Sequence, residues 1–149
     1  MQIFIPYASP LETAKCLDPK RLNRQIQEAK VILDAINGTG KGWFNHPVVK
    51  MYAPHSLWLK FYYECLKKFS EYERYRWGID FADAINNDLM AVKSTPPFLT
   101  EEFCDQHKRR LYTKDNKYYK KFAKYGESEE NWYYVDGGLR KYINGKRIE

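Results

Sequence analysis

The helix that begins near Pro19 constrains the fold more than any other segment. Asp18 is suited to cap it, because a carboxylate can accept the free backbone N–H groups of a first helical turn. Pro19 suits the first helical position, where its missing N–H costs nothing. The spacing of apolar residues predicts a helix over residues 19–37. Its buried stripe is expected to comprise Leu22, Ile26, Ala29, Leu33 and Ile36.

Polar residues at the edge of this stripe predict a working face. Arg21, Arg24, Gln25 and Glu28 follow the same helical period. Arginine suits phosphate, because its planar guanidinium donates two parallel hydrogen bonds. However, Arg24 and Glu28 also form an ordinary i,i+4 pair of the kind found on solvated faces. The pattern therefore leaves both a phosphate-binding groove and a solvated ion pair open.

The rest of the chain predicts a mainly α protein. We expect a short extended segment over residues 2–7, a glycine-rich loop over 38–47 and a loop-like chain from Gly126 onward. Further helices are expected over residues 55–76, ending at Gly78, and over 80–92, 101–112 and 116–125. The first of these has a broad aromatic face that is expected to be buried, comprising Trp58, Phe61, Tyr62, Cys65, Phe69 and Tyr72. The predicted fold is a compact single-domain helical bundle spanning residues 1–149, with about five to six helices and a short N-terminal extended segment.

The balance of charge favours an anionic partner. Lys and Arg number 25 against 19 Asp and Glu, a net charge of +6, and 13 tyrosines add stacking surface. The stretch from Lys108 to Lys124 holds eight bases and one acid, including Arg110 and Lys114. The stretch is predicted to be amphipathic, with Arg110, Lys114, Lys117, Lys121 and Lys124 at helical spacing opposite Leu111, Tyr118 and Phe122. Its charged face is either a phosphate-contacting surface or simply solvated. We expect DNA or a nucleotide as ligand.

Several classes of protein are disfavoured. Cys16, Cys65 and Cys104 lie far apart, which argues against a disulfide scaffold and against zinc knuckles. The start of the chain lacks the pattern of a signal peptide, and no apolar run is long enough to span a bilayer. We expect a cytoplasmic protein (in the host cytoplasm if phage-encoded) without membrane contact. No two histidines have metal-ligand spacing, so neither a metal nor a cofactor is expected.

Two histidines and the chain terminus are candidates for chemistry. His46 lies near Trp43 in the loop, where it either lines a site or is structural, and His107 precedes the basic stretch. An α-amine titrates near pH 8, so a useful fraction is a neutral nucleophile that can attack a sugar C1′ and form a Schiff base. A carboxylate must then handle protons, and Glu28 is the best local option for the amine of Met1.

A set of short motifs is spread along the chain: Leu17-Asp18-Pro19-Lys20-Arg21-Leu22, Gln25, Glu28-Ala29, Gly42-Trp43, His46-Pro47, Lys50-Met51, His107, Leu111, Lys114-Asp115, Tyr118-Tyr119 and Phe122. In these motifs the chain resembles a widespread family of bacterial and phage proteins that is remotely linked to the phage pyrimidine-dimer DNA glycosylases (endonuclease V).

This resemblance implies a compact, helical, cofactor-free DNA glycosylase whose N-terminal α-amine is the nucleophile. The enzyme uses a glutamate in an Arg-Glu pair on an early helix, but here that pair reads Arg24-Gln25, so the carboxylate is replaced by an amide and Glu28 is the substitute. Gln2 is too large to permit removal of the initiator methionine, so the amine would be that of Met1. Trp132 and Tyr133 are similar to the enzyme's C-terminal aromatic cluster.

The sequence thus supports three hypotheses. The first is a DNA N-glycosylase and AP lyase acting on damaged or modified bases, with Met1, Glu28 and Gln25 as catalytic candidates. Candidate phosphate-binding or nucleotide-binding residues are Arg21, Arg24, His46, Lys50, His107, Arg110 and Lys114, and candidate stacking residues are Trp43, Tyr118, Trp132 and Tyr133. The second is a non-catalytic, phage-type protein that sequesters a nucleotide or cyclic nucleotide. The third is nucleic-acid binding without a specific site. The oligomeric state is left open.

Overall fold

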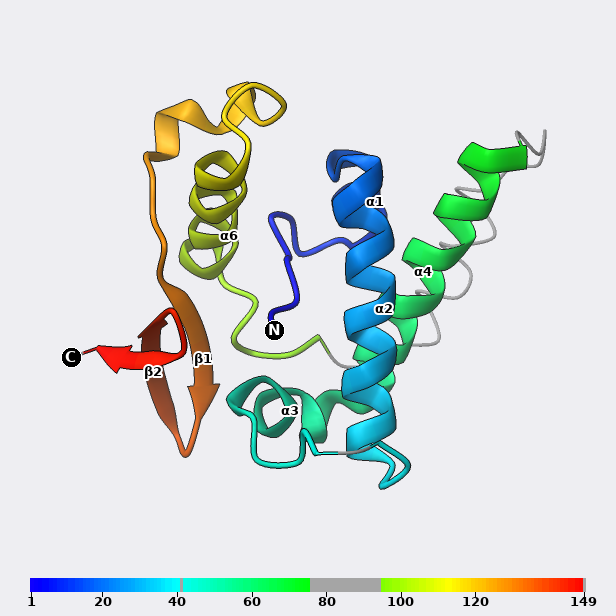
Figure 1. Cartoon of the computed structure of the whole chain (residues 1–149), viewed down its shortest axis with the longest axis vertical. Helices are drawn as coiled ribbons and strands as arrows, with labels where there is room; N and C mark the ends of the chain where they lie inside the picture. The colour runs from blue at the N-terminus through cyan, green and yellow to red at the C-terminus, as the bar shows by residue number, and fades with distance from the viewer. Residues whose placement is uncertain (41, 76–94, 149) are drawn as a thin grey trace.

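The computed structural model describes residues 1–40, 42–75 and 95–148 and is mostly helical, with a small antiparallel sheet near the C-terminus (Figure 1). The helices are α1 (Pro10–Cys16), α2 (Pro19–Ile36), α3 (Pro47–Tyr52), η1 (Ala53–His55), α4 (Ser56–Tyr75), α6 (Glu101–Lys114) and η2 (Lys120–Tyr125). None of the described helices has the length and apolar character needed to cross a membrane. The helix expected over residues 80–92, and the predicted stop at Gly78, lie outside the described residues.

Helix α2 begins as the sequence predicts. The Asp18 carboxylate accepts the backbone N–H of Arg21, and Pro19 occupies the first turn. A shorter helix, α1, precedes it and was not expected, because seven residues span too few turns for a periodic pattern to show. Ser9 caps α1 by accepting the N–H of Glu12. Both starts follow the usual pairing of a polar N-cap with a proline in the first turn.

The buried stripe of α2 is rotated from the predicted one. Ile26, Leu33 and Ile36 are only partly buried, and the face turned to the core instead comprises Leu22, Gln25, Ala29, Ile32 and Ala35. Gln25 is therefore a core residue, only 1% exposed, and not part of a charged edge. An amide buried this deeply must have its hydrogen-bonding groups satisfied within the protein.

The core lies between α2, α4 and the segments that cover them. Helix α4 packs along α2 and contributes Trp58, Leu59, Tyr62 and Leu66 to the buried cluster. This confirms the broad aromatic core face predicted for the segment from His55, although the α-helix itself begins at Ser56. Helix α3 starts at Pro47, inside the predicted loop, where the His46 side chain caps it by accepting the N–H of Val48.

The C-terminal part corrects two predictions. The chain after Gly126 is not a loop but forms β1 (Asn131–Val135), β2 (Gly138–Ile143) and β3 (Lys146–Ile148), an antiparallel sheet in the order β1-β2-β3. Its two tight turns are Asp136-Gly137 and Asn144-Gly145, and all four residues have positive φ. Asp-Gly and Asn-Gly are the typical dipeptides of two-residue hairpins, so this signal was present in the sequence.

The basic stretch is divided between two helical segments, as predicted, but the second is shorter than the expected helix over residues 116–125. Helix α6 ends at Lys114, because Asp115 leaves the helical conformation and its carboxylate accepts the N–H of Tyr118. Only Lys120–Tyr125 coils again, as a 3₁₀ turn. The amphipathic character predicted for the stretch from Lys108 to Lys124 holds in part: Leu111 and Phe122 are buried while most of the cations face solvent. The exceptions are Tyr118, which is exposed, and Lys108, which is 8% exposed and bound to Asp105.

The N-terminal segment runs between α2 and α6 (Figure 1). Residues 2–6 are buried and belong to none of the described strands, although the segment was expected to be extended. With no sheet partner, their backbone groups rely on side chains from the neighbouring helices. This arrangement brings the chain terminus into the middle of the molecule.

Candidate functional site around the chain terminus

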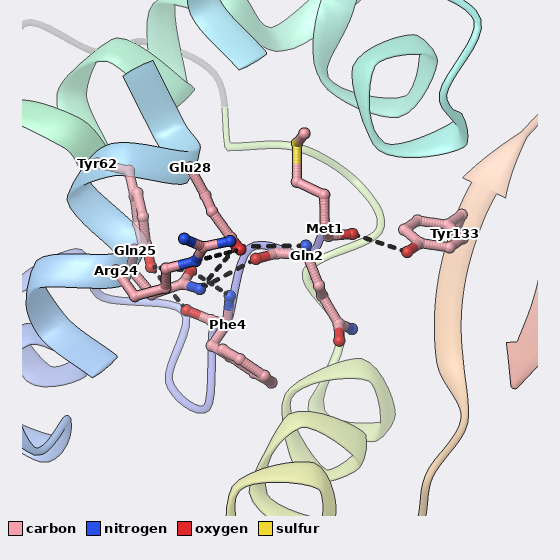
Figure 2. Close-up of polar contacts among 8 residues, drawn as sticks. All are labelled: Met1, Gln2, Phe4, Arg24, Gln25, Glu28, Tyr62 and Tyr133. Atoms are coloured by element: carbon pink, nitrogen blue, oxygen red, sulfur yellow. Dashed lines mark hydrogen bonds and ion pairs between the residues drawn. The ribbon is translucent and has the colours of Figure 1, made fainter. Parts of the chain in front are cut away.

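The side chain of Gln25 pairs with the N-terminal segment as a strand would. Its Oε1 accepts the N–H of Phe4 at 2.8 Å, and its Nε2 donates to the carbonyl of Gln2 at 3.0 Å (Figure 2). Tyr62 on α4 donates both to Gln25 Oε1, at 3.2 Å, and to the Phe4 carbonyl, at 2.8 Å. Because one amide serves as both acceptor and donor, a carboxylate at position 25 could not make the same pair of bonds.

His107 holds the segment from the side of α6. Its Nδ1 accepts the N–H of Ile5 at 2.6 Å, and its Nε2 lies 3.2 Å from the Gln2 amide nitrogen. The ring is fully buried, and burial, with the charge of Arg110 as a smaller cause, lowers its pKa to about 3. His107 is therefore a neutral ring in the interior, away from any position where it could contact phosphate.

The Glu28 carboxylate, at the end of this network, accepts three hydrogen bonds. Its carboxylate accepts the N–H of Gln2 at 3.4 Å, Arg24 Nε at 3.1 Å and Gln25 Nε2 at 3.2 Å (Figure 2). The Glu28 side chain is 15% exposed, whereas that of Arg24 is 68% exposed. These bonds use both carboxylate oxygens, and since a carboxylate has about four lone-pair sites, three donors leave room for a proton.

Met1 is fixed beside this carboxylate. The hydroxyl of Tyr133, on β1, donates to the Met1 carbonyl at 2.8 Å (Figure 2), and burial raises the pKa of Tyr133 to about 12. His46 lies close by, against Tyr133, and burial together with the positive charge of the Met1 amine lowers the pKa of His46. Its ring contacts those of Tyr133 and Trp43 edge to face, at 5.7 and 5.9 Å between centroids.

Two hollows meet at the Arg24–Glu28 ion pair. The smaller, which we call the amine hollow, measures about 250 Å³ and is lined by Met1, Arg24, Gln27, Glu28, Val31 and Trp43. The larger, which we call the cation groove, measures about 580 Å³ and is lined by Phe4, Lys20, Arg21, Asn23, Arg24, Gln25, Gln27, Glu28 and Lys114. Since Arg24, Gln27 and Glu28 line both, the hollows are adjacent along α2.

A buried acid, Asp18, holds Arg21 in place at the wall of the cation groove. Asp18 binds Arg21 Nη1 at 3.2 Å and accepts a short hydrogen bond from the Tyr119 hydroxyl. Burial opposes ionisation of Asp18, but the bonds from Tyr119 and Arg21 prevail and lower its pKa. Across the groove, burial lowers the pKa of Lys114, and the positive charges of Arg110 and Arg21 add to that effect. The cations repel one another, which favours a bound anion.

The structure brings together only some of the residues singled out from the sequence. Met1, Arg24, Glu28, Trp43, His46 and Tyr133 surround the chain terminus, while Arg21 and Lys114 line the cation groove. Lys50 lies with Met51 and Phe98 in a different hollow, and the exposed Tyr118 borders another near Lys15. Trp132 is buried, with its Nε1 donating to Glu130. Arg110 is half-buried and binds Asn131.

Sequence reasoning missed Gln27 and Val31, which lie at four-residue spacing on α2 and line the amine hollow together with Trp43. Helical spacing from Arg24 and Glu28 was the signal that could have found both. Within the described ranges, no three His, Cys, Asp or Glu side chains gather closely enough to hold a metal ion.

Comparison with known proteins gives one match. Residues 1–77 match the model of a family described as pyrimidine dimer DNA glycosylase. No curated protein and no solved structure matches the chain. The matched residues include α1 to α4 and hence Met1, Arg24, Gln25, Glu28 and Trp43, whereas His107, Lys114 and Tyr133 follow the matched region.

Proposed function

The chain belongs to the pyrimidine dimer DNA glycosylase family, and from that premise we propose that it is a DNA N-glycosylase and AP lyase whose nucleophile is the α-amine of Met1. Its substrate is a damaged or modified base in DNA. The family places this chain among DNA repair glycosylases. The nucleophile, the lyase step and the residue roles are the proposal.

One observation carries the proposal. Glu28 accepts the N–H of Gln2, the residue that follows the terminus, and Met1 and Glu28 line the same hollow. An amine nucleophile needs a nearby carboxylate to move protons, and the structure supplies this pair from residues 27 positions apart in the sequence. Tyr133 adds support, because its bond to the Met1 carbonyl restricts where the amine can point.

The chemistry balances with these groups alone. The neutral amine forms a bond to C1′ while the C1′–base bond breaks, and the base leaves with the electron pair and takes up a proton. The amine nitrogen then gives up one proton to Glu28. The C1′–O4′ bond breaks with its electron pair going to O4′, which takes up that proton, and a protonated Schiff base is left between the Met1 nitrogen and C1′. Glu28 then accepts a proton from C2′, and the 3′ phosphate leaves by elimination, which nicks the strand.

We assign the carboxylate role to Glu28 and a positioning role to Gln25. The Gln25 side chain forms its hydrogen bonds within the protein. Its oxygen accepts from the Phe4 N–H and the Tyr62 hydroxyl, and its nitrogen donates to the Gln2 carbonyl and the Glu28 carboxylate. An amide cannot act as a general base. The amide that replaces the family's glutamate is therefore consistent with catalysis, since the acid sits one turn further along α2.

Borohydride trapping tests this function. Purified protein, shown by mass spectrometry to start at Met1, is incubated with duplex DNA containing a natural abasic site, and the reduced adduct is measured. Glu28→Gln should nick such DNA at least about 100-fold more slowly than wild type, since general acid–base catalysis contributes about 10²–10⁴-fold. Glu127→Gln, at an exposed carboxylate outside both hollows, is the matched control and should nick normally. Absence of any trapped adduct with wild type would contradict the proposal.

The size of the cation groove favours a second candidate function, sequestration of a nucleotide. At about 580 Å³ the groove lies within the range of small-ligand sites, and it is lined by Lys20, Arg21, Arg24 and Lys114. A thermal-shift screen with mononucleotides and cyclic dinucleotides distinguishes the two functions, because a ligand that binds only the folded state raises the melting temperature. Stoichiometric binding of one such nucleotide without its consumption, and without DNA nicking, would favour sequestration.

A further inference from the structure

The C-terminal sheet carries a concentration of positive charge. Residues 138–148, which form β2, β3 and the turn between them, include Arg140, Lys141, Lys146 and Arg147 and no acid. Lys146 and Arg147 are exposed, whereas Arg140 and Lys141 are partly exposed. Both strands follow residues 1–77, so they lie outside the region that matches the family. A surface of this charge favours an anionic partner.

The register of the sheet gathers two of these arginines on the face that carries Tyr133. Directly opposite residues of antiparallel strands share a face, as do alternate residues of one strand. Arg140 lies opposite Tyr133. Tyr142 lies opposite Asn131 on β1 and Arg147 on β3. We call the three residues Arg140, Tyr142 and Arg147 the basic sheet face.

The basic sheet face adjoins the proposed reaction site. The Tyr133 hydroxyl donates to the Met1 carbonyl, and its ring contacts that of Tyr142 at 5.4 Å between centroids. Figure 2 shows Met1 between Glu28, on α2, and Tyr133, on β1. DNA that reacts at Met1 and extends away from α2 would therefore pass over the basic sheet face.

Cations of α6 connect this face to the cation groove. Arg110 donates to the side chain of Asn131 at 3.1 Å, and Asn131 shares the face of Tyr142. Burial lowers the pKa of Lys114, and the charge of Arg110, one turn earlier on α6, adds to that effect. Positive side chains thus continue from Lys114 in the groove through Arg110 to the sheet. A nucleic-acid backbone is an anion long enough to follow such a track.

The same charges disfavour a second copy of the chain as the partner. β3 is the last strand of the sheet in the described part of the chain, so its outer edge could pair with another strand. Lys146 and Arg147 are exposed on this strand. Cations on an edge strand deter pairing with an identical edge, because like charges would be brought together.

We propose that the basic sheet face binds phosphates of the DNA that flanks the reacting nucleotide, through Arg140 and Arg147 with Tyr142 adjoining both. This inference rests on the proposed function for its choice of DNA as the ligand. It adds a contact that the matched region lacks and gives β2 and β3 a role, since neither strand contributes a residue to the amine hollow or the cation groove.

Salt-dependent binding to an unreactive duplex tests the proposal. The probe is a labelled duplex with a central tetrahydrofuran abasic analogue, which cannot form a Schiff base, titrated by fluorescence anisotropy between roughly 50 and 200 mM salt. Each arginine that contacts a phosphate contributes about 0.9 to the slope of log affinity against log salt, so Arg140→Gln combined with Arg147→Gln should lower the slope by about 1.8. Arg140→Lys combined with Arg147→Lys keeps the charge and should keep the slope.

A matched pair and two shortened duplexes locate the contact. Lys117→Gln combined with Lys120→Gln removes the same charge at exposed positions outside the cation groove and should leave the slope unchanged. Removing most of the duplex from one side of the analogue should abolish the difference between wild type and the arginine-to-glutamine pair, and removing it from the other side should preserve that difference.

Three results would overturn the inference: a wild-type slope in the arginine-to-glutamine pair, an equal decrease in the Lys117 and Lys120 pair or in the arginine-to-lysine pair, or a difference that survives both shortened duplexes. Borohydride trapping reports separately on the proposed function, because every variant retains Met1 and Glu28. A protein that binds through the sheet but forms no trapped adduct would lose the proposed function and keep the sheet contact.

Discussion

The two sides of the N-terminal segment contribute differently to the site. The side made by α2 lies within the family match and supplies the proposed reactive groups and most of the lining of both hollows, including Arg24, Glu28 and Trp43. The side made by α6 and β1 lies beyond the match and fixes the segment, through His107 on the Ile5 backbone and Tyr133 on that of Met1. The chemistry and its support therefore come from separate parts of the sequence, and each can be perturbed alone.

Gln25→Glu should produce the largest effect on stability. The new carboxylate cannot donate to the Gln2 carbonyl and would be buried, so we expect a loss of about 3 kcal/mol in the free energy of unfolding. Urea denaturation measures it. Gln27→Glu, on the same helix but exposed, should change stability by less than about 0.5 kcal/mol. Equal effects of the two substitutions would mean that Gln25 does not hold the segment.

Low pH should have the second largest effect on stability, because it protonates His107 on the α6 side of the N-terminal segment. His107 has a folded-state pKa of about 3 and an ordinary value of 6.5, so the unfolded chain binds a proton that the folded chain refuses. The contribution of His107 to the free energy of unfolding is fully present above pH 6.5. It is lost as the pH falls from 6.5 toward 3, by about 1.4 kcal/mol per pH unit. Urea denaturation measures the free energy of unfolding at pH 7 and at pH 5. Its decrease between the two should be about 2 kcal/mol smaller in His107→Gln than in wild type. The less buried His55 provides a control variant, His55→Gln, which should retain most of the wild-type loss.

Tyr133→Phe should have a smaller effect on stability and a clear effect on reaction. Loss of the bond to the Met1 carbonyl is expected to cost about 1 kcal/mol. Trapping on abasic DNA should slow about fivefold, because a loosened terminus samples more orientations. Tyr142→Phe, which leaves the ring against Tyr133 but has no bond to Met1, is the matched comparison. An unchanged trapping rate in Tyr133→Phe would show that Tyr133, and with it β1, does not position the Met1 amine.

Lys114→Ala should have the smallest effect, confined to DNA affinity. A lysine that contacts one phosphate contributes about one unit to the slope of log affinity against log salt, independent of sequence. Anisotropy titrations between 50 and 200 mM salt, as order-of-magnitude conditions, measure that slope. Lys50→Ala, on α3 and outside the cation groove, should leave it unchanged. A slope unaffected by Lys114→Ala would exclude this residue from the phosphate path.

Local signals in the sequence predicted much of the α2 side. The Asp18 cap, the start at Pro19 and the core face of α4 follow from capping and periodicity, and these are confirmed. The α6 side was harder to predict from the sequence. Its hairpins are indicated only by two turn dipeptides, and α6 ends at a single Asx turn at Asp115.

The site itself could be predicted only in part. Met1 and Glu28 were paired from chemistry, but sequence could not show that Gln25 faces inward, since a polar residue at a core position violates the apolar pattern. The positions of His107 and Tyr133 depend on contacts spanning more than 100 residues, which no local pattern encodes. Their functions follow only once the N-terminal segment is seen between the two sides.

Peptide mapping of the borohydride-trapped adduct tests the central claim most directly. Three residues with an amine line the two hollows: Met1 the amine hollow, and Lys20 and Lys114 the cation groove, where burial lowers the pKa of Lys114. Digestion and mass spectrometry of the complex with abasic DNA should place the adduct on the α-amine of Met1, with Lys114 unmodified. An adduct on Lys114 or another lysine would contradict the account.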